Sequence, residues 1–329
     1  MNTMIKNGDM MSQLSAIPII INFITGSLCI LFGVNTLSKG LEKANSRLME
    51  KSITTFTGTL SSSFATGTIL TAIVQSSTAV MVITIGLVNS GIMSLKQAMG
   101  IIYGANIGTT ITAQIMSFNL SRLSIPIIIV SLALKTIAIK KTAKYLCDTL
   151  LGIGVMFLGL FILNWGVPHI KSSPVIYSIF TKYGQNPYIS MLVGICSTML
   201  VHSSSATVGI TIVLFNSGLI SFESSVGLML GDNIGTCATS QLAAFKASLN
   251  ARRTAWAHTI YNIIGVVIAL LMLPWFSSIV KYITFVIGQG ENKLIANSHT
   301  LFNILSAVIF LPFTGAYIVF IKRLVKKKT

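Results

Sequence analysis

The sequence predicts an all-α polytopic membrane protein built from two related halves. Three observations predict it: the composition, an internal repeat, and hydroxyl-rich segments within apolar runs. Of the 329 residues, 53% are hydrophobic and 9% are charged, and the mean hydropathy is +0.80. Soluble domains carry about 25% charged residues. Because so few charges cannot cover a water-facing surface, the composition argues against a soluble enzyme.

The formal net charge of +16 does not indicate nucleic-acid binding, because the basic residues do not form one patch. They lie in short clusters between apolar runs: Lys39, Lys43, Arg47 and Lys51; Lys140, Lys141 and Lys144; Arg252 and Arg253; and Lys322, Arg323, Lys326, Lys327 and Lys328. Loops that flank membrane helices carry such clusters. We therefore expect a multi-pass protein of the cell membrane, in contact with lipid and without a nucleic-acid partner.

Apolar runs along the chain give six candidate membrane spans. They cover residues 17–37, 123–139, 146–165, 255–276, 277–288 and 301–321. Residues 1–15 are mixed and polar, and no small-residue cleavage site follows the first run, so we expect no cleavable signal peptide. The cysteines lie in or beside apolar stretches without metal-ligand spacing, which predicts buried free thiols: Cys29, Cys147, Cys196 and Cys237.

An internal repeat fixes the organisation of the chain. Residues 67–118 align without a gap on residues 194–245, and 23 of the 52 pairs are identical. The shared words are QSSTA on HSSSA, NSG on NSG, and GANIGT on GDNIGT. Repeats indicate architecture before any local assignment does. We expect a single transmembrane domain over residues 1–329, with one repeat over about 22–139, a second over about 150–321, and an inverted relation between them.

The repeated words predict breaks in membrane helices. Residues 54–90 and 186–217 are apolar overall but rich in Ser, Thr and Gly, which permit close packing and helix interruption. Non-helical backbone at membrane depth is tolerated where protein or a water-filled cavity covers it. We therefore interpret each QSST or HSSS word as a break between half-helices or the tip of a re-entrant hairpin. The GxNIGT words predict a second irregularity.

Consecutive hydroxyls at a helix break suit a site for a cation and an anion together. Side-chain oxygens and freed carbonyls can replace the water shell of a monovalent cation. The N-terminus of the following half-helix presents free N–H groups to an anion. Helix packing alone does not require the same polar residues to recur at a fixed distance along the chain, so the paired motifs favour a binding site. The hydroxyls of an isolated Ser pair more often form hydrogen bonds within their own helix.

Two positions at which the copies differ are coupling candidates. Asp232 replaces Ala105, and an intramembrane acid is a functional hypothesis by default, with a water-exposed loop as the alternative. His202 replaces Gln75 and would permit proton coupling, although a neutral hydrogen-bond donor in place of Gln is the simpler interpretation. A further pattern pairs His258 with Asn262, and His299 with Asn303; it is a site element or, as we prefer, a set of interhelical hydrogen bonds.

The paired motifs resemble those of the sodium–phosphate cotransporter family, the type II kind with its bacterial relatives. The resemblance covers about residues 22–253 and implies duplicated QSSS motifs in inverted repeats, and it implies no C-terminal regulatory domain here. The phosphate-binding residues that it implies are Ser76, Ser77, Thr78, Ser203, Ser204 and Ser205. The sodium-binding residues that it implies, together with the ligand argument above, are Gln75, Ser77, Asn106, Thr109, Ser204, Asn233 and Thr236.

The expected function is therefore secondary active, sodium-coupled symport of inorganic phosphate by a non-enzyme. No cofactor is expected besides sodium as coupling ion, and assembly into a homo-oligomer is left open. Proton coupling or another oxyanion on the same scaffold is the first alternative, and a channel or membrane sensor is another. An intramembrane serine hydrolase is the remote one, because His202 directly precedes Ser203 and the chain has no GxSxG or HExxH motif.

Overall fold

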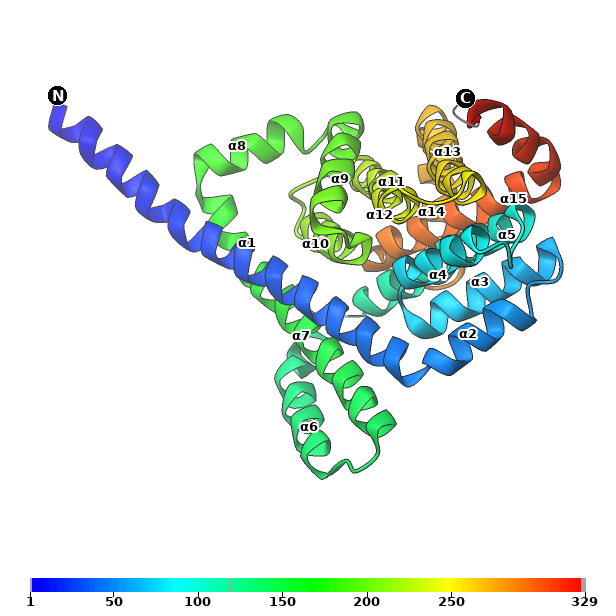
Figure 1. Cartoon of the computed structure of the whole chain (residues 1–329). Coiled ribbons are helices and arrows are strands. Elements are labelled where there is room, and N and C mark those ends of the chain that lie inside the picture. Colours follow the sequence, from blue (N-terminus) through cyan, green and yellow to red (C-terminus); the bar gives the residue numbers. More distant parts are fainter. Residues whose placement is uncertain (1, 119, 327–329) are drawn as a thin grey trace.

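The computed structural model describes residues 2–118 and 120–326, with the side chains of residues 17–49, 51–118 and 120–326. Every regular element in this part of the chain is helical (Figure 1). The elements are α1 (Asn2–Ala44), α2 (Ser46–Thr55), α3 (Leu60–Val74), α4 (Ser77–Asn89), α5 (Leu95–Met116), η1 (Ser121–Leu123), α6 (Ser124–Ile137), α7 (Lys141–Ser172), α8 (Pro174–Tyr183), α9 (Pro187–Val201), α10 (Ser204–Asn216), α11 (Phe222–Gly235), α12 (Cys237–Ala244), α13 (Leu249–Leu271), α14 (Leu273–Val286), η2 (Glu291–Lys293) and α15 (Leu294–Leu324).

Four helices are long and apolar enough to cross a bilayer, judged over the residues described. They are α1 from Ile17, α7, α13 and the segment from Glu291 to Leu324. The segment Leu95–Met116 with Ser121–Ile137, bent by 79°, makes a fifth if it is counted as one span. The all-α membrane fold is as predicted, but two expected spans are wrong as separate crossings, because their helices are too short. The expected span at 277–288 falls in α14, which has 14 residues, and the one at 123–139 falls in α6, which has 14 residues and reaches the length of a span only in the bent pair.

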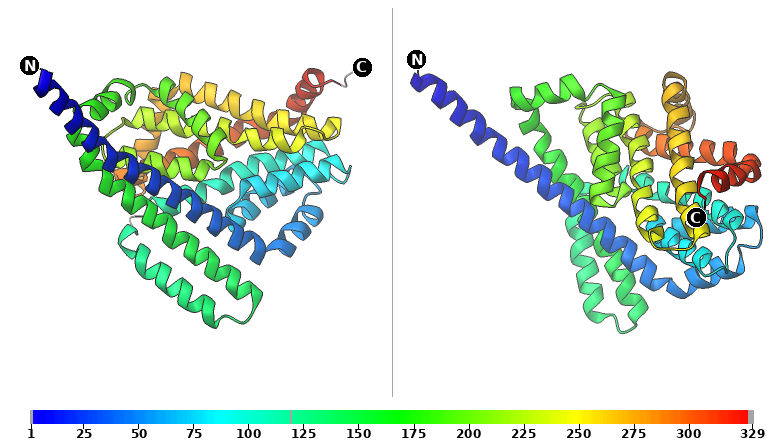
Figure 2. Two further views of the ribbon diagram at one scale, coloured as in Figure 1. Left: turned by 60° about the vertical axis from the view of Figure 1, so that its left-hand side comes forward. Right: turned by 45° about the horizontal axis from the view of Figure 1, so that its top comes forward.

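Helices α1 and α7 pack antiparallel along a seam of glycines. Each helix places a glycine every seventh residue on the contact face, and a Cβ added at any of them would meet atoms of the other helix. The glycines are Gly26, Gly33 and Gly40 on α1 and Gly152, Gly159 and Gly166 on α7. Small residues let membrane helices approach to backbone contact. Figure 1 shows the two helices crossing the molecule side by side, and Figure 2 agrees.

Helices α3 and α4 form a hairpin rather than a continuous span. The following helix, α5, runs parallel to α3, so α4 has returned the chain to the end at which α3 began. Contacts that establish the direction are Gly100 with Leu60, Gly104 with Phe64, and Gly108 with Thr68. At 15 and 13 residues the two arms are about 22 and 20 Å long, less than a bilayer core. The predicted break at Gln75 and Ser76 is therefore the tip of a re-entrant hairpin.

Helices α9, α10 and α11 repeat this arrangement. The corresponding contacts, each displaced by 127 positions, are Gly227 with Pro187, Gly231 with Met191, and Gly235 with Ile195. The arms again have 15 and 13 residues. The local packing of the two copies thus agrees contact by contact. The bounds 22–139 and 150–321 and the inverted relation stay predictions.

The second irregularity, expected at both GxNIGT words, exists in one copy only. Thr236 interrupts the second word, since α11 ends at Gly235 and α12 begins at Cys237. The first word lies inside the unbroken α5, so the expectation of a break there is wrong. Gly108 and Gly235 both pack on the backbone of the parallel helix, so these contacts do not cause the difference, and Thr236 itself keeps helical dihedral angles.

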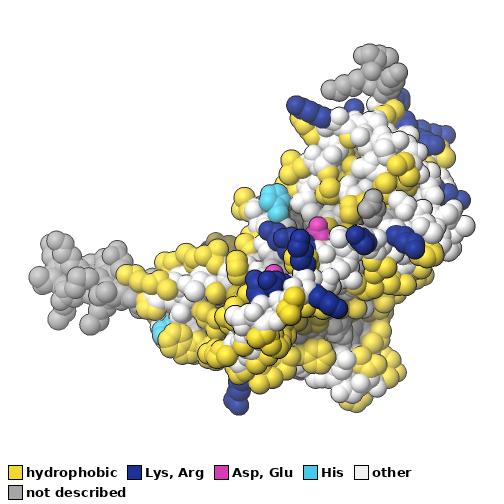
Figure 3. Space-filling view, turned by 60° about the horizontal axis from the view of Figure 1, so that its bottom comes forward, with side chains coloured by type: hydrophobic (Ala, Val, Ile, Leu, Met, Phe, Trp, Pro, Cys, Tyr) yellow, Lys and Arg dark blue, Asp and Glu magenta, His cyan; other side chains and the backbone are white. Residues whose placement is uncertain are grey.

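Basic side chains gather on one face of the molecule. The end of α1 and the start of α7 meet there, because Gly40 lies against Tyr145 and Thr149. Figure 3 shows Lys and Arg side chains over this face, with hydrophobic side chains around them. Large apolar side chains such as Leu200 and Phe285 are exposed elsewhere in the chain, as expected where lipid replaces water. Lys327 and Lys328 of the last basic cluster lie outside the described residues.

Candidate functional site

The two hairpin tips have the same unusual backbone. Gln75 has φ 57° and His202 has φ 53°, and they are the two non-glycine residues with positive φ among those described. Each serves as the C-cap of the helix that precedes it. The left-handed conformation is costly for a residue with a Cβ and clusters at functional sites. Because both tips adopt this costly conformation, we infer that the surrounding structure holds each of them in it.

A new helix, α4 or α10, begins directly after each tip. The Ser76 hydroxyl accepts from the N–H of Ala79, and the Ser203 hydroxyl accepts from the N–H of Ala206, so both serines are N-caps. The first N–H groups of α4 and α10 have no partner within their helices. The N-terminus of a helix carries a partial positive charge and presents these N–H groups to an anion.

Both tips open on one cavity of about 180 Å³. Its lining includes most of the residues that the sequence singled out: Gln75, Ser76, Ser77, Thr78, Thr109, His202, Ser203, Ser204, Ser205 and Thr236. These residues come from α4, α5 and α10, from the two tips, and from Thr236 between α11 and α12, and the tips lie more than 120 positions apart in the chain. A larger cavity of about 550 Å³ beside α1 and α9 has mostly apolar walls and contains none of the serines of the two tips.

The third wall of the cavity belongs to α1 and was missed from the sequence. Asn35, Ser38, Lys39 and Glu42 line it. These positions follow the i, i+3, i+4, i+7 spacing of one helix face, and that polar stripe at the end of an apolar span was a usable signal. Lys39 had instead been assigned to a basic loop cluster. The wall adds one positive and one negative side chain to an otherwise neutral lining.

Gln75 is fastened at the first tip by three hydrogen bonds. Its Nε2 donates to the Ala72 carbonyl, and its Oε1 accepts from the Thr112 hydroxyl at 2.5 Å. Its carbonyl accepts from Ser38 at 2.7 Å, which ties the tip to α1. The second tip differs, because the His202 side chain is exposed and directed to the cavity lining.

Three of the predicted site residues do not line the cavity. Asn106 is buried and donates to Asn262 Oδ1 at 2.8 Å, and Asn233 donates to the Met229 carbonyl at 2.9 Å. Asp232 is fully buried within α11, so the loop alternative is wrong for it. Its Oδ1 accepts from the Thr198 hydroxyl at 2.9 Å. Thr198 does line the cavity, which places Asp232 directly behind the wall.

The His258 pattern forms hydrogen bonds between helices, as preferred from the sequence. His258 Nδ1 and Ser240 Oγ are 2.8 Å apart, joining α13 to α12, while Asn262 joins α13 to α5 through Asn106. The neighbouring threonine on α13, Thr259, accepts from Gln241 at 2.7 Å. The α15 copy differs, since Asn303 donates to the His299 carbonyl of its own helix.

The cavity combines what an oxyanion and a hard monovalent cation each need. Two helix N-termini and the Lys39 ammonium group supply positive potential, and about a dozen neutral hydroxyl, amide and carbonyl groups supply oxygen ligands and donors. Asp232 bonds to a threonine and not to a histidine, so the described residues assemble no Ser–His–Asp relay.

Known proteins share this sequence over nearly its full length. Residues 29–164 and 172–290 match the model of the Na+/Pi-cotransporter family. The uncharacterized protein YqeW of Bacillus subtilis is 31% identical over 314 residues, which cover 94% of this chain and 99% of YqeW. No solved structure matches the chain.

Two further relatives carry functional names. The putative inorganic phosphate export protein YjbB of Escherichia coli K12 is 27% identical over 263 residues, 80% of this chain. This chain matches 48% of YjbB, about half of its length. The sodium-dependent phosphate transport protein 2A of Ovis aries is 32% identical over 92 residues, 27% of this chain and 14% of that protein. On the extent of the family match and the likeness to YqeW, the chain belongs to the Na+/Pi-cotransporter family, a family of membrane transporters.

Proposed function

We propose that the protein is a secondary active transporter that couples the movement of inorganic phosphate to sodium. The observation that carries the proposal is the single cavity onto which both hydroxyl motifs and both half-helix N-termini open. A carrier with a site between two related halves needs this convergence. A channel would need a continuous path instead.

In this proposal phosphate lies between the N-termini of α4 and α10. It accepts from the free N–H groups there and from the hydroxyls of Ser77, Thr78, Ser204 and Ser205, with Lys39 close by. Sodium takes oxygen ligands from Gln75, Thr109 and Thr236 around the same cavity. Each ion lowers the electrostatic cost of binding the other in a low-dielectric site, and this mutual stabilisation is the coupling. We assign Asn106 and Asn233 an indirect role, because they lie behind the wall.

The names of the relatives support parts of this proposal. Sodium dependence is in the name of the 2A protein, and phosphate is in the names of 2A and YjbB. YjbB is named as an exporter, so net flux out of the cell is compatible with the family. We place the protein in the cell membrane, with lipid around its apolar faces.

The test is radiolabelled phosphate flux in proteoliposomes, with and without a sodium gradient. We expect flux only with the gradient, and loss of flux in the double variant Ser77→Ala/Ser204→Ala. The matched control is Ser90→Ala/Ser217→Ala, which removes a second serine pair at the same 127-residue offset, at helix C-caps away from the cavity. Sodium-independent phosphate flux in folded protein would overturn the coupling, and no phosphate flux would overturn the substrate.

His202 is the reason to retain one alternative. It is exposed at the cavity and stands where the first copy has an amide, so a proton could replace sodium as the coupling ion. Flux driven by a pH step in sodium-free buffer, and lost in His202→Gln, would favour that mechanism. Competition by arsenate but not sulfate would support phosphate as the oxyanion.

A further inference from the structure

Helix α11, which packs against the second hairpin, has a buried carboxylate that no described protein group neutralises. Asp232 has no exposed surface, and its Oδ2 has no hydrogen-bond partner. The two ion pairs among the described side chains, Lys135 with Asp148 and Lys281 with Glu223, do not include it. An ionised carboxylate in a low-dielectric interior is costly unless a cation or several donors face it.

Oxygen atoms of three other residues form a chain of contacts that starts at this carboxylate. The Thr198 hydroxyl donates to Asp232 Oδ1 at 2.9 Å and lies 3.1 Å from the Thr207 hydroxyl. Thr207 in turn lies 3.3 Å from the Ser203 carbonyl, at the break between α9 and α10. Ser203 is the N-cap of α10, and its carbonyl also accepts from the Thr207 N–H at 3.3 Å. A carboxylate, hydroxyls and backbone carbonyls are the ligand types that hard cations take in proteins.

The first hairpin lacks this set although its backbone is the same. At the corresponding positions Ala105 replaces Asp232 and Val80 replaces Thr207. Thr71, which corresponds to Thr198, is fully buried with its hydroxyl unpartnered. The glycine contacts beneath both sets agree, so the difference lies in the side chains alone. Among the described residues, the corresponding positions of the first copy therefore do not carry this set of oxygens.

We propose that Asp232, Thr198, Thr207 and the Ser203 carbonyl bind one sodium ion behind the wall of the cavity. The identification of the ion as sodium rests on the function proposed above. Ser203 is the N-cap of α10, and Thr198 is part of the cavity wall. An ion at this position therefore holds the second tip in the form that presents the α10 N-terminus to phosphate. The transporter thus has one carboxylate cation site and not a symmetric pair.

The first experiment measures sodium binding without phosphate, in purified protein in detergent. We expect sodium chloride to raise the thermal midpoint of the wild type above its value in choline chloride, because a ligand of the folded state stabilises it. We expect Asp232→Asn to abolish this rise, and Thr207→Val to reduce it. The matched control is Thr71→Val, which removes the equivalent hydroxyl of the first hairpin and should leave the rise unchanged.

The second experiment measures phosphate flux against sodium concentration. In Thr207→Val the half-saturating sodium concentration should rise about 10-fold, the loss of one good ligand, with a smaller change in half-saturating phosphate at saturating sodium. Thr207→Val keeps the volume of the side chain, so the test survives if Asp232→Asn does not fold. Wild-type sodium affinity in both variants would overturn the site while leaving the proposed function intact.

A wild type without phosphate transport, but with sodium stabilisation that depends on Asp232, would overturn the proposed function and support the site. If phosphate flux needs sodium and also persists at full rate in Asp232→Asn, the proposed function is supported and the sodium site at Asp232 is overturned. A pH-driven, sodium-free flux that is lost in Asp232→Asn would show that the carboxylate carries a proton, and would overturn the sodium assignment.

Discussion

The hairpins α3–α4 and α9–α10 share a backbone but are held by different side chains. The first tip is fastened by Gln75, through Ala72, Thr112 and Ser38. The second tip has an exposed His202 and relies on the oxygen cluster around Asp232 below it. The first tip is thus held by protein groups alone, while the second, in our proposal, is completed by a sodium ion. Duplication can keep a geometry while the means of stabilising it diverges.

The largest expected effect breaks the feature that the hairpins share. A Cβ at Gly104 or Gly231 would lie against the carbonyl oxygen of Phe64 or Met191. We expect Gly104→Val and Gly231→Val to lose about 3 kcal/mol or more each, because the parallel helices would be forced apart. Size-exclusion profiles and thermal midpoints in detergent measure this loss.

The control for both glycine variants is Gly86→Val. An added Cβ at Gly86 meets no atom within 4 Å, and the second copy has Val213 at that position. This variant should fold like the wild type. If one of Gly104→Val and Gly231→Val is tolerated while the other is not, the two hairpins are not packed alike.

The next effect separates the tips. Gln75→Ala removes two side-chain hydrogen bonds at a buried position and should cost about 1–3 kcal/mol. His202→Ala removes an exposed side chain and should change the stability by less than about 0.5 kcal/mol. Thermal midpoints of the two variants at matched sodium concentration give the comparison. Equal losses would mean that His202 fastens its tip through contacts like those of Gln75.

A smaller loss of stability is expected at the N-cap serines, which occur at both tips. Ser76→Ala and Ser203→Ala each remove an N-cap and should cost about 1 kcal/mol. Both should also weaken phosphate binding to a similar degree, since each cap orients a helix N-terminus toward the cavity. Isothermal phosphate titration of the two variants would measure this. A large effect from one serine only would place phosphate on one N-terminus.

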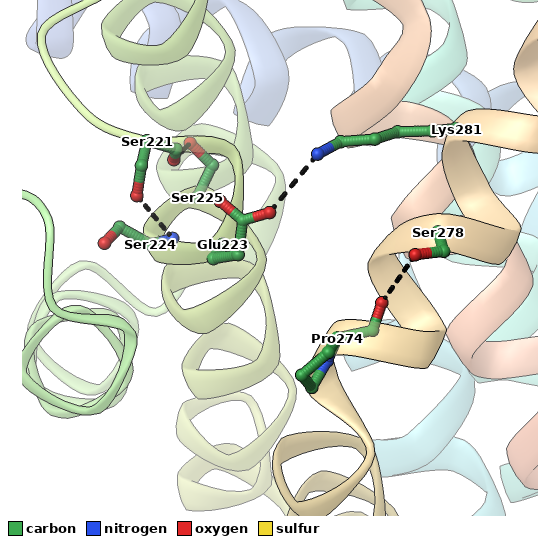
Figure 4. Close-up of polar contacts among 7 residues, drawn as sticks. All are labelled: Ser221, Glu223, Ser224, Ser225, Pro274, Ser278 and Lys281. Carbon is green, nitrogen blue, oxygen red and sulfur yellow. Dashed lines mark hydrogen bonds and ion pairs between the residues drawn. The ribbon is translucent and has the colours of Figure 1, made fainter.

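The smallest expected effect concerns an ion pair at the start of α11. Glu223 in the first turn of α11 pairs with Lys281 of α14 at 3.3 Å, next to the N-cap Ser221 (Figure 4). The first copy has Lys96 at the corresponding position. Because the pair is exposed, Glu223→Lys should cost no more than about 1 kcal/mol, including the helix-dipole contribution. A larger shift of the thermal midpoint would mean that the pair anchors α14.

The repeated sequence predicted the hairpins, because identical polar residues at a constant separation in the chain indicate the same local backbone geometry in both copies. Gln75 and His202 were recognisable as break positions, and both are left-handed. The α1 wall was missed because its charges were interpreted by composition and not by helical spacing. Asn106 and Asn233 were placed with the site by motif membership, but a six-residue helical word turns through more than one face, so some of its members point away.

The outcome at Thr236 could not be predicted from the sequence. The two GxNIGT words differ at Asp232 and Cys237, and neither residue breaks a helix by intrinsic preference. Whether such a word stays helical depends on the helices that pack against it. The buried state of Asp232 was likewise open, because one acid in an apolar segment fits both a loop and a core.

The glycine seam between α1 and α7 constrains how the molecule can move. Since five of the six glycines lie against the opposing backbone, and Gly166 lies against the Asn22 side chain, a shift of the helices by one residue would set larger side chains against these surfaces, so the pair resists sliding. We therefore expect α1 and α7 to move as one rigid unit. Each continues through a ten-residue helix, α2 or α8, into one hairpin. In the proposed transport cycle, we expect the bending for alternating access to occur at α2 and α8, which link the rigid α1–α7 pair to the two hairpins.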